Sequence, residues 1–307
     1  GTSSDIQAAL DGPEGIARLC PGATFDVQQT IRMTRPGQQV FTEGTPGQVE
    51  RAKLSLANVT FSSAITASGT SDVLISNIEV AGGHRLGDPN STDRAAQISL
   101  GGMRATGQTA TYNKLANPRG WTALHISEGY MTGQTPGCQN ATVTHNVIGP
   151  AGTPTGVADG ISLACGTSTV TDNIITDATD GAIVVFGAKG SRVANNTIIA
   201  DTRELLGGIN MVDTGINNSN TSEVGRFTYE GTVVEDNVIE ARNKLIHNGI
   251  AMGELVWACR GMTVIPAVVG GTVRDNVTRG DYMGFSYAAN GTRDWTAVGN
   301  VDTSIHN

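Results

Sequence analysis

The sequence predicts an all-β fold, a single-stranded parallel β-helix that starts with a capping helix. Three observations predict it: an asparagine that recurs in a fixed local pattern, a second set of apolar segments between these asparagines, and a short amphipathic segment at the beginning. The 307 residues contain no recognisable linker, so we expect one domain over 1–307, with the cap and first turn in 1–30.

The recurring asparagine stands three residues after an aliphatic or small residue and is usually followed by another aliphatic residue. Its members are Asn77, Asn113, Asn146, Asn173, Asn196, Asn237, Asn276 and Asn300. By subtraction, the steps between them are 36, 33, 27, 23, 41, 39 and 24 residues. The shortest steps fit one bare turn of a parallel β-helix, and the longer ones contain insertions. Asparagine suits such a bend because it hydrogen-bonds its own backbone, tolerates a left-handed conformation and can stack its amide on the next turn.

Composition indicates a β-rich, turn-rich protein of the kind that is secreted, with 40 glycines and 16% charged residues. The net charge of −8 argues against nucleic acid as a partner, and no apolar run is long enough to span a membrane. Eight glycosylation sequons predict a secreted, extracellular glycoprotein, although a Thr-rich and Asn-rich chain also gains sequons by chance. The sequons are at Asn58, Asn90, Asn140, Asn195, Asn217, Asn220, Asn276 and Asn290.

The four cysteines divide into a pair and two others. Cys138 and Cys165 each lie eight residues before a recurring asparagine, so they occupy the same place on adjacent turns. Stacked turns are about 4.8 Å apart, close to the Cα separation that a disulfide accepts. We therefore expect a bridge between Cys138 and Cys165. Cys20 and Cys259 are either free or joined to each other, which would need a long loop to fold back.

The first residues read as an amphipathic helix, from Asp5 to Leu10, followed by a strand and a Pro-Gly bend. A helix there would cover the open apolar end of the coil. This opening, with the asparagine turns behind it, resembles the pectin-lyase-like superfamily of right-handed parallel β-helices over most of residues 5–303. The resemblance implies the right-handed fold, and it is specific for fold rather than activity, because the superfamily includes hydrolases, lyases, epimerases and binding proteins.

The characterised branches of that superfamily assign no catalytic residue to this chain. Polygalacturonase-like hydrolases carry Asn-Thr-Asp, Asp-Asp, Gly-His-Gly and Arg-Ile-Lys motifs, and pectate lyases carry an Asp-His pair and an Arg-x-Pro-x-x-Arg run. None of these is present. The chain more nearly resembles poorly characterised β-helix proteins that fungi secrete.

A second register of apolar segments predicts the sheet that floors a groove. Alternate aliphatic residues, such as Ile161 and Leu163, point inward by the strand's period of two, so Ser162, Asn210 and His125 point outward. The segments are 95–100, 121–126, 159–163, 180–185, 207–211, 248–252 and 283–287. Most long insertions follow these segments and would form walls beside the groove.

Asp159 and Asp180 are the leading catalytic candidates. Each precedes a glycine in one of two consecutive groove segments, so we expect their carboxyl groups about one strand spacing, or roughly 5 Å, apart. Two like charges that close raise one pKa, which gives the protonated and ionised pair that glycoside hydrolysis requires. Glu128 and Asp213 end neighbouring groove segments and would support them. The alternative is that each Asp merely forms a favoured turn with its glycine.

His125 belongs both to this set and to a rival constellation with Lys114 and Arg119. A polysaccharide lyase needs a base to remove a proton beside a uronate carboxylate, and a cation to stabilise the anion that results. The acidic walls of the groove would repel a polyuronate unless Ca²⁺ bridged the two. The hydrolase hypothesis requires no cofactor. Trp121 and Trp257 are candidate platforms for sugar rings, with packing as the alternative, and Asn210 is a candidate substrate contact.

These observations predict a secreted, carbohydrate-active enzyme that cleaves a polysaccharide or oligosaccharide in a groove, most simply a glycoside hydrolase. We expect it to be monomeric. The alternatives are a lyase that acts by β-elimination on a uronate polymer, and a non-catalytic carbohydrate-binding or cell-wall protein.

Overall fold

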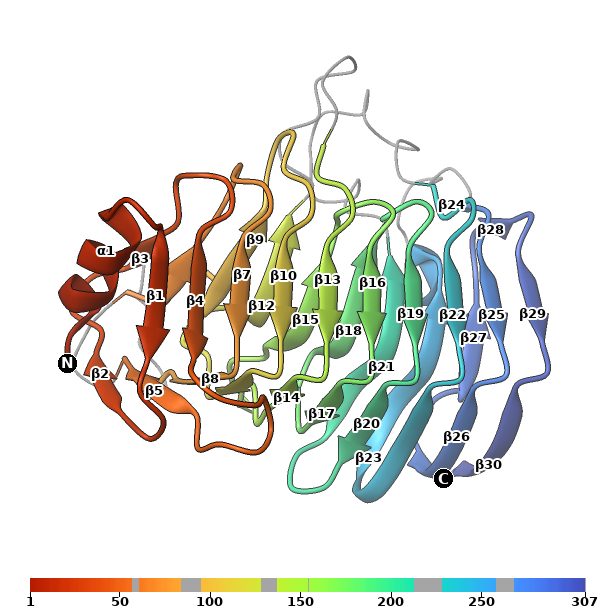
Figure 1. Ribbon diagram of the computed structural model, residues 1–307. Coiled ribbons are helices and arrows are strands. Elements are labelled where there is room, and N and C mark those ends of the chain that lie inside the picture. The colour runs from red at the N-terminus through yellow and green to blue at the C-terminus, as the bar shows by residue number, and fades with distance from the viewer. Residues whose placement is uncertain are drawn as a thin grey trace.

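The computed structural model describes residues 1–56, 61–83, 95–127, 137–153, 155–212, 228–257 and 268–306. The chain winds as a right-handed parallel β-helix, and its strands stack on three faces (Figure 1). All named strand pairings are parallel, as the sequence predicts, and one hydrophobic core runs along the inside from Ile6 to Tyr282.

The first face is a ten-stranded sheet that runs the length of the molecule (Figure 1). Each strand is short because a bend follows it at once. In order, the strands are β1 (Ile16–Leu19), β4 (Gln39–Thr42), β7 (Leu74–Ser76), β10 (Thr109–Thr111), β13 (Thr142–Thr144), β16 (Thr169–Thr171), β19 (Arg192–Ala194), β22 (Val233–Glu235), β25 (Thr272–Arg274) and β29 (Thr296–Val298).

The second face follows the recurring asparagine in each turn. Its strands are β2 (Thr24–Asp26), β5 (Ala52–Ser55), β8 (Ile78–Ala81), β11 (Lys114–Ala116), β14 (Val147–Ile148), β17 (Ile174–Thr176), β20 (Thr197–Ala200), the first part of β23 (Val238–Met252), β26 (Val277–Tyr282) and β30 (Val301–His306). Because β23 continues round the bend, this face and the third belong to one sheet.

The third face is the sheet that the second apolar register predicts. Its strands are β3 (Ile31–Arg32), β6 (Ile65–Thr66), β9 (Ile98–Gly101), β12 (Thr122–Ser127), β15 (Asp159–Leu163), β18 (Gly181–Phe186), β21 (Leu205–Val212), the last part of β23 and β27 (Tyr287–Ala289). A small pair, β24 (Val268–Val269) and β28 (Thr292–Arg293), and the 3-10 turn η2 (Glu254–Val256) lie outside the faces.

The recurring asparagines form a hydrogen-bonded ladder at the bend between the first and second faces. From Asn146 to Asn276, each side-chain Nδ2 donates to the Oδ1 of the next asparagine at 2.9 Å, and the last acceptor is Asn300. Each also donates to a first-face carbonyl, as Asn173 does to Val143 at 3.0 Å. Stacking between turns is therefore the reason for the repeat, as the sequence predicts.

The left-handed conformation, however, belongs to the residue before the ladder asparagine in most turns. His145, Asp172, Asn195, Asp236 and Asp275 have φ between 55° and 58°, and Asn77 is the one ladder member with a positive φ, at 54°. The preceding residue turns the chain, which lets the ladder asparagine point its amide into the bend.

The predicted disulfide and the predicted cap are both present. Cys138 and Cys165 are bonded, with their Cα atoms 4.7 Å apart, and Cys20 is an exposed free thiol. Helix α1 (Ser3–Asp11) buries Ile6 and Leu10 against the first turns and lies over the N-terminal end of the coil (Figure 1). No helix in the described segments has the length and apolar character needed to cross a membrane.

Candidate functional site

The third face carries polar side chains at equivalent positions of several turns, interrupted by Val184. His125 pairs with Ser162, Ser162 with Val184, and Val184 with Asn210. A parallel row, three residues earlier, contains Thr122, Asp159, Gly181, Gly207 and Asn248. These two rows bring Asp159, Ser162, Thr122 and Asn210 together, and we call these four residues the polar cluster.

Asp159 is the centre of the polar cluster. It begins β15, is only 4% exposed, and accepts hydrogen bonds from the Gly181 amide (3.0 Å) and the Ser162 hydroxyl (2.8 Å). Burial, and secondarily the charge of Asp180, raise the pKa of Asp159 to about 8, against the lowering effect of those two donors. Asp159 is therefore a neutral carboxylic acid at neutral pH.

The hydroxyl groups around Asp159 fit the protonated form. Ser162 Oγ lies 2.8 Å from Asp159 Oδ2 and 2.9 Å from Thr122 Oγ1. A serine hydroxyl has a single proton to donate. On protonation the Ser162–Asp159 bond reverses: Asp159 Oδ2 donates to Ser162, Ser162 keeps its donation to Thr122, and the Thr122 hydroxyl faces the carbonyl oxygen of Leu124 at 3.3 Å. Every proton in this chain then has an acceptor.

Asp180 does not occupy the position that the sequence suggests. The backbone register pairs Asp159 with Gly181, because Ile161 pairs with Ile183, and it places Asp180 opposite Ala158. The expectation of equivalent positions is wrong by one residue: a shared Asp-Gly dipeptide does not set the register, which the apolar residues of the strand determine. Asp180 is half-buried, burial raises its pKa, and its charge still acts on Asp159.

Two glycines let the neighbouring side chains pack closely around Asp159. A Cβ atom on Gly181 would lie 2.9 Å from Asn210 Nδ2 and 3.5 Å from Asp159 Oδ1, and one on Gly207 would lie 2.1 Å from Asn210 Oδ1. Asn210 is 5% exposed, and within the described part of the chain its Oδ1 has no hydrogen-bond partner. An unpaired buried amide oxygen is costly, so this position is suited to a ligand hydroxyl.

His125 and Trp121 lie at the N-terminal side of the polar cluster. Their rings meet edge to face with centroids 4.9 Å apart, and burial lowers the pKa of His125 to about 4. The imidazole is therefore neutral at neutral pH and can act as a hydrogen-bond partner there.

The structure separates Lys114 from His125. Lys114 lies on the second face, where its Nζ pairs with Glu79 at 3.1 Å. Arg119 donates to the carbonyl oxygen of Gly82 at 2.6 Å. The prediction that Lys114 contacts a substrate together with His125 is therefore not supported, whereas a contact from Arg119 stays a prediction.

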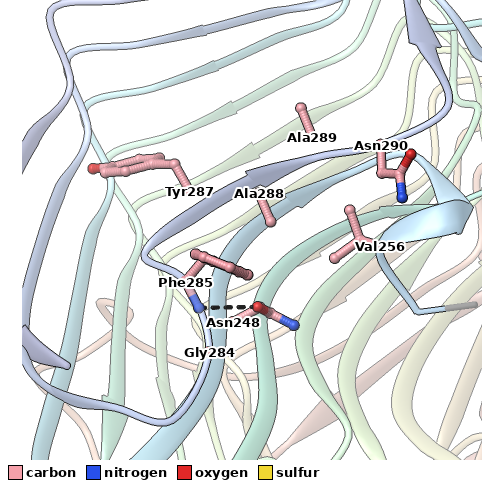
Figure 2. Close-up of a pocket in the computed structure, with 8 residues that line it drawn as sticks. All are labelled: Asn248, Val256, Gly284, Phe285, Tyr287, Ala288, Ala289 and Asn290. Carbon is pink, nitrogen blue, oxygen red and sulfur yellow. Dashed lines mark hydrogen bonds between the residues drawn. The ribbon is translucent and has the colours of Figure 1, made fainter. Parts of the chain in front are cut away.

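A cavity of about 530 Å³ continues the third face toward the C-terminal end (Figure 2). The Phe285 backbone amide donates to Asn248 Oδ1 at 3.2 Å, and the Phe285 side chain is 65% exposed beside it. Val256 lines the opposite wall, next in sequence to the predicted platform Trp257, whose buried Nε1 has no partner within the residues described. Sequence reasoning missed Phe285 because its segment was interpreted as an apolar strand.

A second cavity, of about 410 Å³, borders Thr179, the residue before Asp180, at the bend that leads into the third face. Its lining includes Thr179, Leu206, Arg203, Lys244 and His247. Sequence reasoning missed the three basic residues, although one signal was available. The ladder step from Asn196 to Asn237 is 41 residues, the same as the pairing of Leu205 with Ile246, so the loops before those strands could have been aligned.

Several predicted residues fall outside the described residues: Glu128, Asp213, Cys259 and the sequons at Asn58, Asn90, Asn217 and Asn220. Among the described sequons, Asn140, Asn195 and Asn290 are exposed. Asn276 is fully buried in the ladder and donates to Asn300, so a glycan there would break the ladder, and this position is withdrawn. No described group of three or more His, Cys, Asp or Glu side chains could hold a metal ion, and Ca²⁺ stays a prediction.

No protein-family model matches the chain, and no curated protein sequence matches it. Solved structures do match over nearly its full length. The surface protein and adhesin PfbA of Streptococcus pneumoniae aligns with a TM-score of 0.56 and 10% identity, over 98% of this chain and 92% of its own. The polygalacturonase of Erwinia carotovora ssp. carotovora aligns with a TM-score of 0.55 and 13% identity, over 96% of this chain and 92% of its own.

At such identities the similarity concerns the fold, which here is common to an adhesin and to an enzyme. In its fold, the chain is a right-handed parallel β-helix that resembles the pectin-lyase-like proteins.

Proposed function

We propose that this protein is a secreted, carbohydrate-active enzyme that hydrolyses a glycosidic bond of a polysaccharide lying along the third face. The observation that carries the proposal is the Asp159–Asp180 pair: one buried carboxyl group with a pKa near 8 that interacts with a second, more exposed one. Environments that separate the protonation states of two nearby carboxyl groups are typical of glycosidase acid and base assignments.

In this mechanism Asp159 is the general acid. A glycosidic oxygen that reaches the carboxyl group of Asp159 would take its proton as the bond to the anomeric carbon breaks. Asp180 carries the negative charge and either attacks the anomeric carbon directly or removes a proton from the water that does so. If Asp180 attacks, the Asp159 carboxylate then takes a proton from the water that cleaves the glycosyl-enzyme and so recovers its own proton. If Asp180 is the base, it keeps the proton from water, and exchange with solvent restores both groups; in each case the hydroxyl group from water ends on the new reducing sugar.

Other features of the third face suit a sugar polymer. Trp121 at one end and the exposed Phe285 at the other offer aromatic surfaces for sugar rings, and Asn210 Oδ1 offers an acceptor for a hydroxyl group. The Cys138–Cys165 disulfide and the exposed sequons at Asn140 and Asn195 support secretion.

A second candidate function is non-catalytic carbohydrate binding. It is favoured by one observation: Asp159 is 4% exposed, and both its oxygens already take part in internal hydrogen bonds. In that case the polar cluster would fix the shape of a binding groove, and the neutral acid would never transfer its proton.

The test is a screen of purified protein against plant, fungal and algal polysaccharides that reads reducing ends and ultraviolet absorbance together. Asp159→Asn and Asp180→Asn should each lower the release of reducing ends by about a thousandfold, while Asp294→Asn, an exposed acid in the last turns, should leave it unchanged. Full activity in both variants would place the chemistry elsewhere.

The same screen separates the alternatives. Unsaturated products that absorb in the ultraviolet would identify a lyase and would contradict the hydrolase. Binding of a polymer that survives both substitutions, without any product from the unmodified protein, would establish the second candidate function.

A further inference from the structure

The hydroxyl groups of Thr122 and Ser162 connect the carboxyl group of Asp159 to the backbone of the neighbouring strand. Thr122 begins β12 and pairs with Asp159 in the register of the third face, and Ser162 lies three residues after Asp159 on β15. Both side chains are 0% exposed. Bulk water therefore cannot serve either hydroxyl group, and the two depend on the protein for their hydrogen bonds.

These two groups, which we call the hydroxyl chain, lie within hydrogen-bonding distance of each other and of a partner at each end. Ser162 Oγ lies 2.8 Å from Asp159 Oδ2 and 2.9 Å from Thr122 Oγ1. Thr122 Oγ1 in turn lies 3.3 Å from the carbonyl oxygen of Leu124. A carbonyl oxygen can only accept, whereas a carboxyl group donates when it is protonated and only accepts when it is ionised. The direction of the hydroxyl chain therefore depends on the proton of Asp159.

The protonated form of Asp159 satisfies every contact of the hydroxyl chain. It donates to Ser162, and Ser162 donates to Thr122. Thr122 then donates to the carbonyl oxygen of Leu124, so each proton has an acceptor. In the ionised form Ser162 must give its single proton to the carboxylate. Thr122 can then donate to Ser162 or to Leu124 but not to both, so the ionised form makes one hydrogen bond fewer.

The two hydroxyl groups act on Asp159 in opposite directions. Burial and the charge of Asp180 raise the pKa of Asp159, whereas the hydrogen bonds from Gly181 and Ser162 lower it. Thr122 does not contact the carboxyl group, and it acts only through Ser162. By accepting the Ser162 proton, Thr122 draws that donor away from Asp159 and leaves the Ser162 oxygen free to accept. Thr122 therefore favours the protonated acid, and Ser162 as a donor favours the carboxylate.

The other groups around Asp159 cannot follow its proton in this way. The Gly181 amide donates to Oδ1 in both forms. On β12 the one titratable side chain is His125, which is neutral because burial lowers its pKa to about 4. Asp180 precedes β18 and contributes its charge, while β18, β21 and residues 150–158 carry no titratable side chain. The hydroxyl chain is thus the part of these surroundings that reverses with the proton.

We propose that Thr122 is a positioning residue for the general acid: it accepts the proton of Ser162, and so allows Ser162 to accept and hold the proton of Asp159. The proposal rests on the proposed function for the role of Asp159 as an acid, but the proton itself can be observed without a substrate. On proton transfer the O–H bond of Asp159 breaks and an O–H bond forms at the glycosidic oxygen. Ser162 then turns its proton to the carboxylate, and both hydroxyl groups keep their own protons.

The test measures the protonation of Asp159 by infrared spectroscopy. Each protein is compared with the same protein carrying Asp159→Asn, which isolates the absorption of the Asp159 carboxylic acid, and a titration from pH 4 to pH 10 gives its midpoint. Thr122→Val should lower the midpoint by about half to one pH unit, because valine keeps the shape but leaves the Ser162 proton no acceptor except Asp159. Ser162→Ala should raise it by about the same amount, because the carboxylate loses a donor.

Three further variants serve as controls. Thr122→Ser keeps the hydroxyl group and should leave the midpoint unchanged. Thr70→Val removes a buried hydroxyl group of another turn, which donates to the carbonyl oxygen of Met33 at 2.9 Å, and should also leave it unchanged. Thr122→Ala removes the same hydroxyl group as Thr122→Val and supplies the comparison if the valine variant does not fold. A purely structural role would not move the midpoints of Thr122→Val and Ser162→Ala in opposite directions.

The outcomes separate this proposal from the proposed function. Opposite movements with unchanged controls would support the hydroxyl chain, whereas movement in the same direction, or an unchanged midpoint in Thr122→Val and Thr122→Ala, would overturn it. No carboxylic acid absorption above pH 6 in the unmodified protein would also overturn it. With a cleaved polysaccharide, the alkaline limb of kcat/KM should follow the midpoints. Midpoints that move as expected without cleavage of any polysaccharide would support the hydroxyl chain and contradict hydrolysis.

Discussion

The asparagine ladder and the polar cluster are both built from buried polar side chains contributed by successive turns. In the ladder, each amide from Asn146 onward bonds to the next turn and to a backbone carbonyl. In the polar cluster, a neutral carboxyl group and an amide oxygen without a described partner lie beside two glycines. Equal burial therefore accompanies two different arrangements, one internally satisfied and one with an amide oxygen that has no partner among the described residues.

The largest difference is expected between an Asn-to-Ala substitution in the ladder and the same substitution in the polar cluster. Asn173→Ala should destabilise the protein by about 3–5 kcal/mol, because it leaves buried partners on both neighbouring turns without hydrogen bonds. Asn210→Ala should change stability by about 1 kcal/mol or less, because its Oδ1 has no described partner to lose. Urea unfolding of both variants measures this contrast.

Asn195→Gly is the control for the ladder, because it changes a residue beside a ladder asparagine and leaves every ladder amide in place. It alters the exposed neighbour of Asn196 while keeping the left-handed conformation that residue 195 adopts, so it should cost much less than Asn173→Ala. Equal losses for Asn173→Ala and Asn210→Ala would mean that the polar cluster is a structural feature like the ladder.

The next contrast is the pH dependence of stability. The pKa of Asp159 is about 8 in the folded protein and near 3.8 without burial, so its contribution is fully present below pH 3.8 and is lost as pH rises to about 8. Over that window, stability should fall by up to about 1.4 kcal/mol per pH unit on account of this group. Unfolding midpoints at pH 5, 7 and 9 measure the slope.

Asp159→Asn should remove that slope and raise stability above pH 7. Its amide reproduces the neutral acid, since Oδ1 can still accept from Gly181 and Nδ2 can donate to Ser162. Asn173→Ala, by contrast, should shift the whole stability curve without changing its pH dependence. An unchanged slope in Asp159→Asn would show that Asp159 is ionised in the folded protein.

The sequence is sufficient to predict the ladder and the disulfide because both repeat at fixed offsets from aliphatic residues. It is insufficient at Asp159 and Asp180, where the two turns share a dipeptide but differ in register by one residue. The register follows from the pairing of Ile161 with Ile183. Among the described residues, Arg203 and Lys244 form no ion pair. A sequence could not predict this, because it does not show which charged side chains lie close together.

The smallest effect is expected for a polar residue outside both the asparagine ladder and the polar cluster, and it serves as the baseline for the other variants. Lys114 is partly exposed on the second face and pairs with Glu79, so Lys114→Gln should change stability by less than about 1 kcal/mol. Turnover should stay within about twofold, because Lys114 is not among the residues that line either cavity. Reducing-end release and urea unfolding of this variant supply both values. A large loss of turnover with normal stability would return Lys114 to the active site and would favour the lyase constellation over the carboxyl pair.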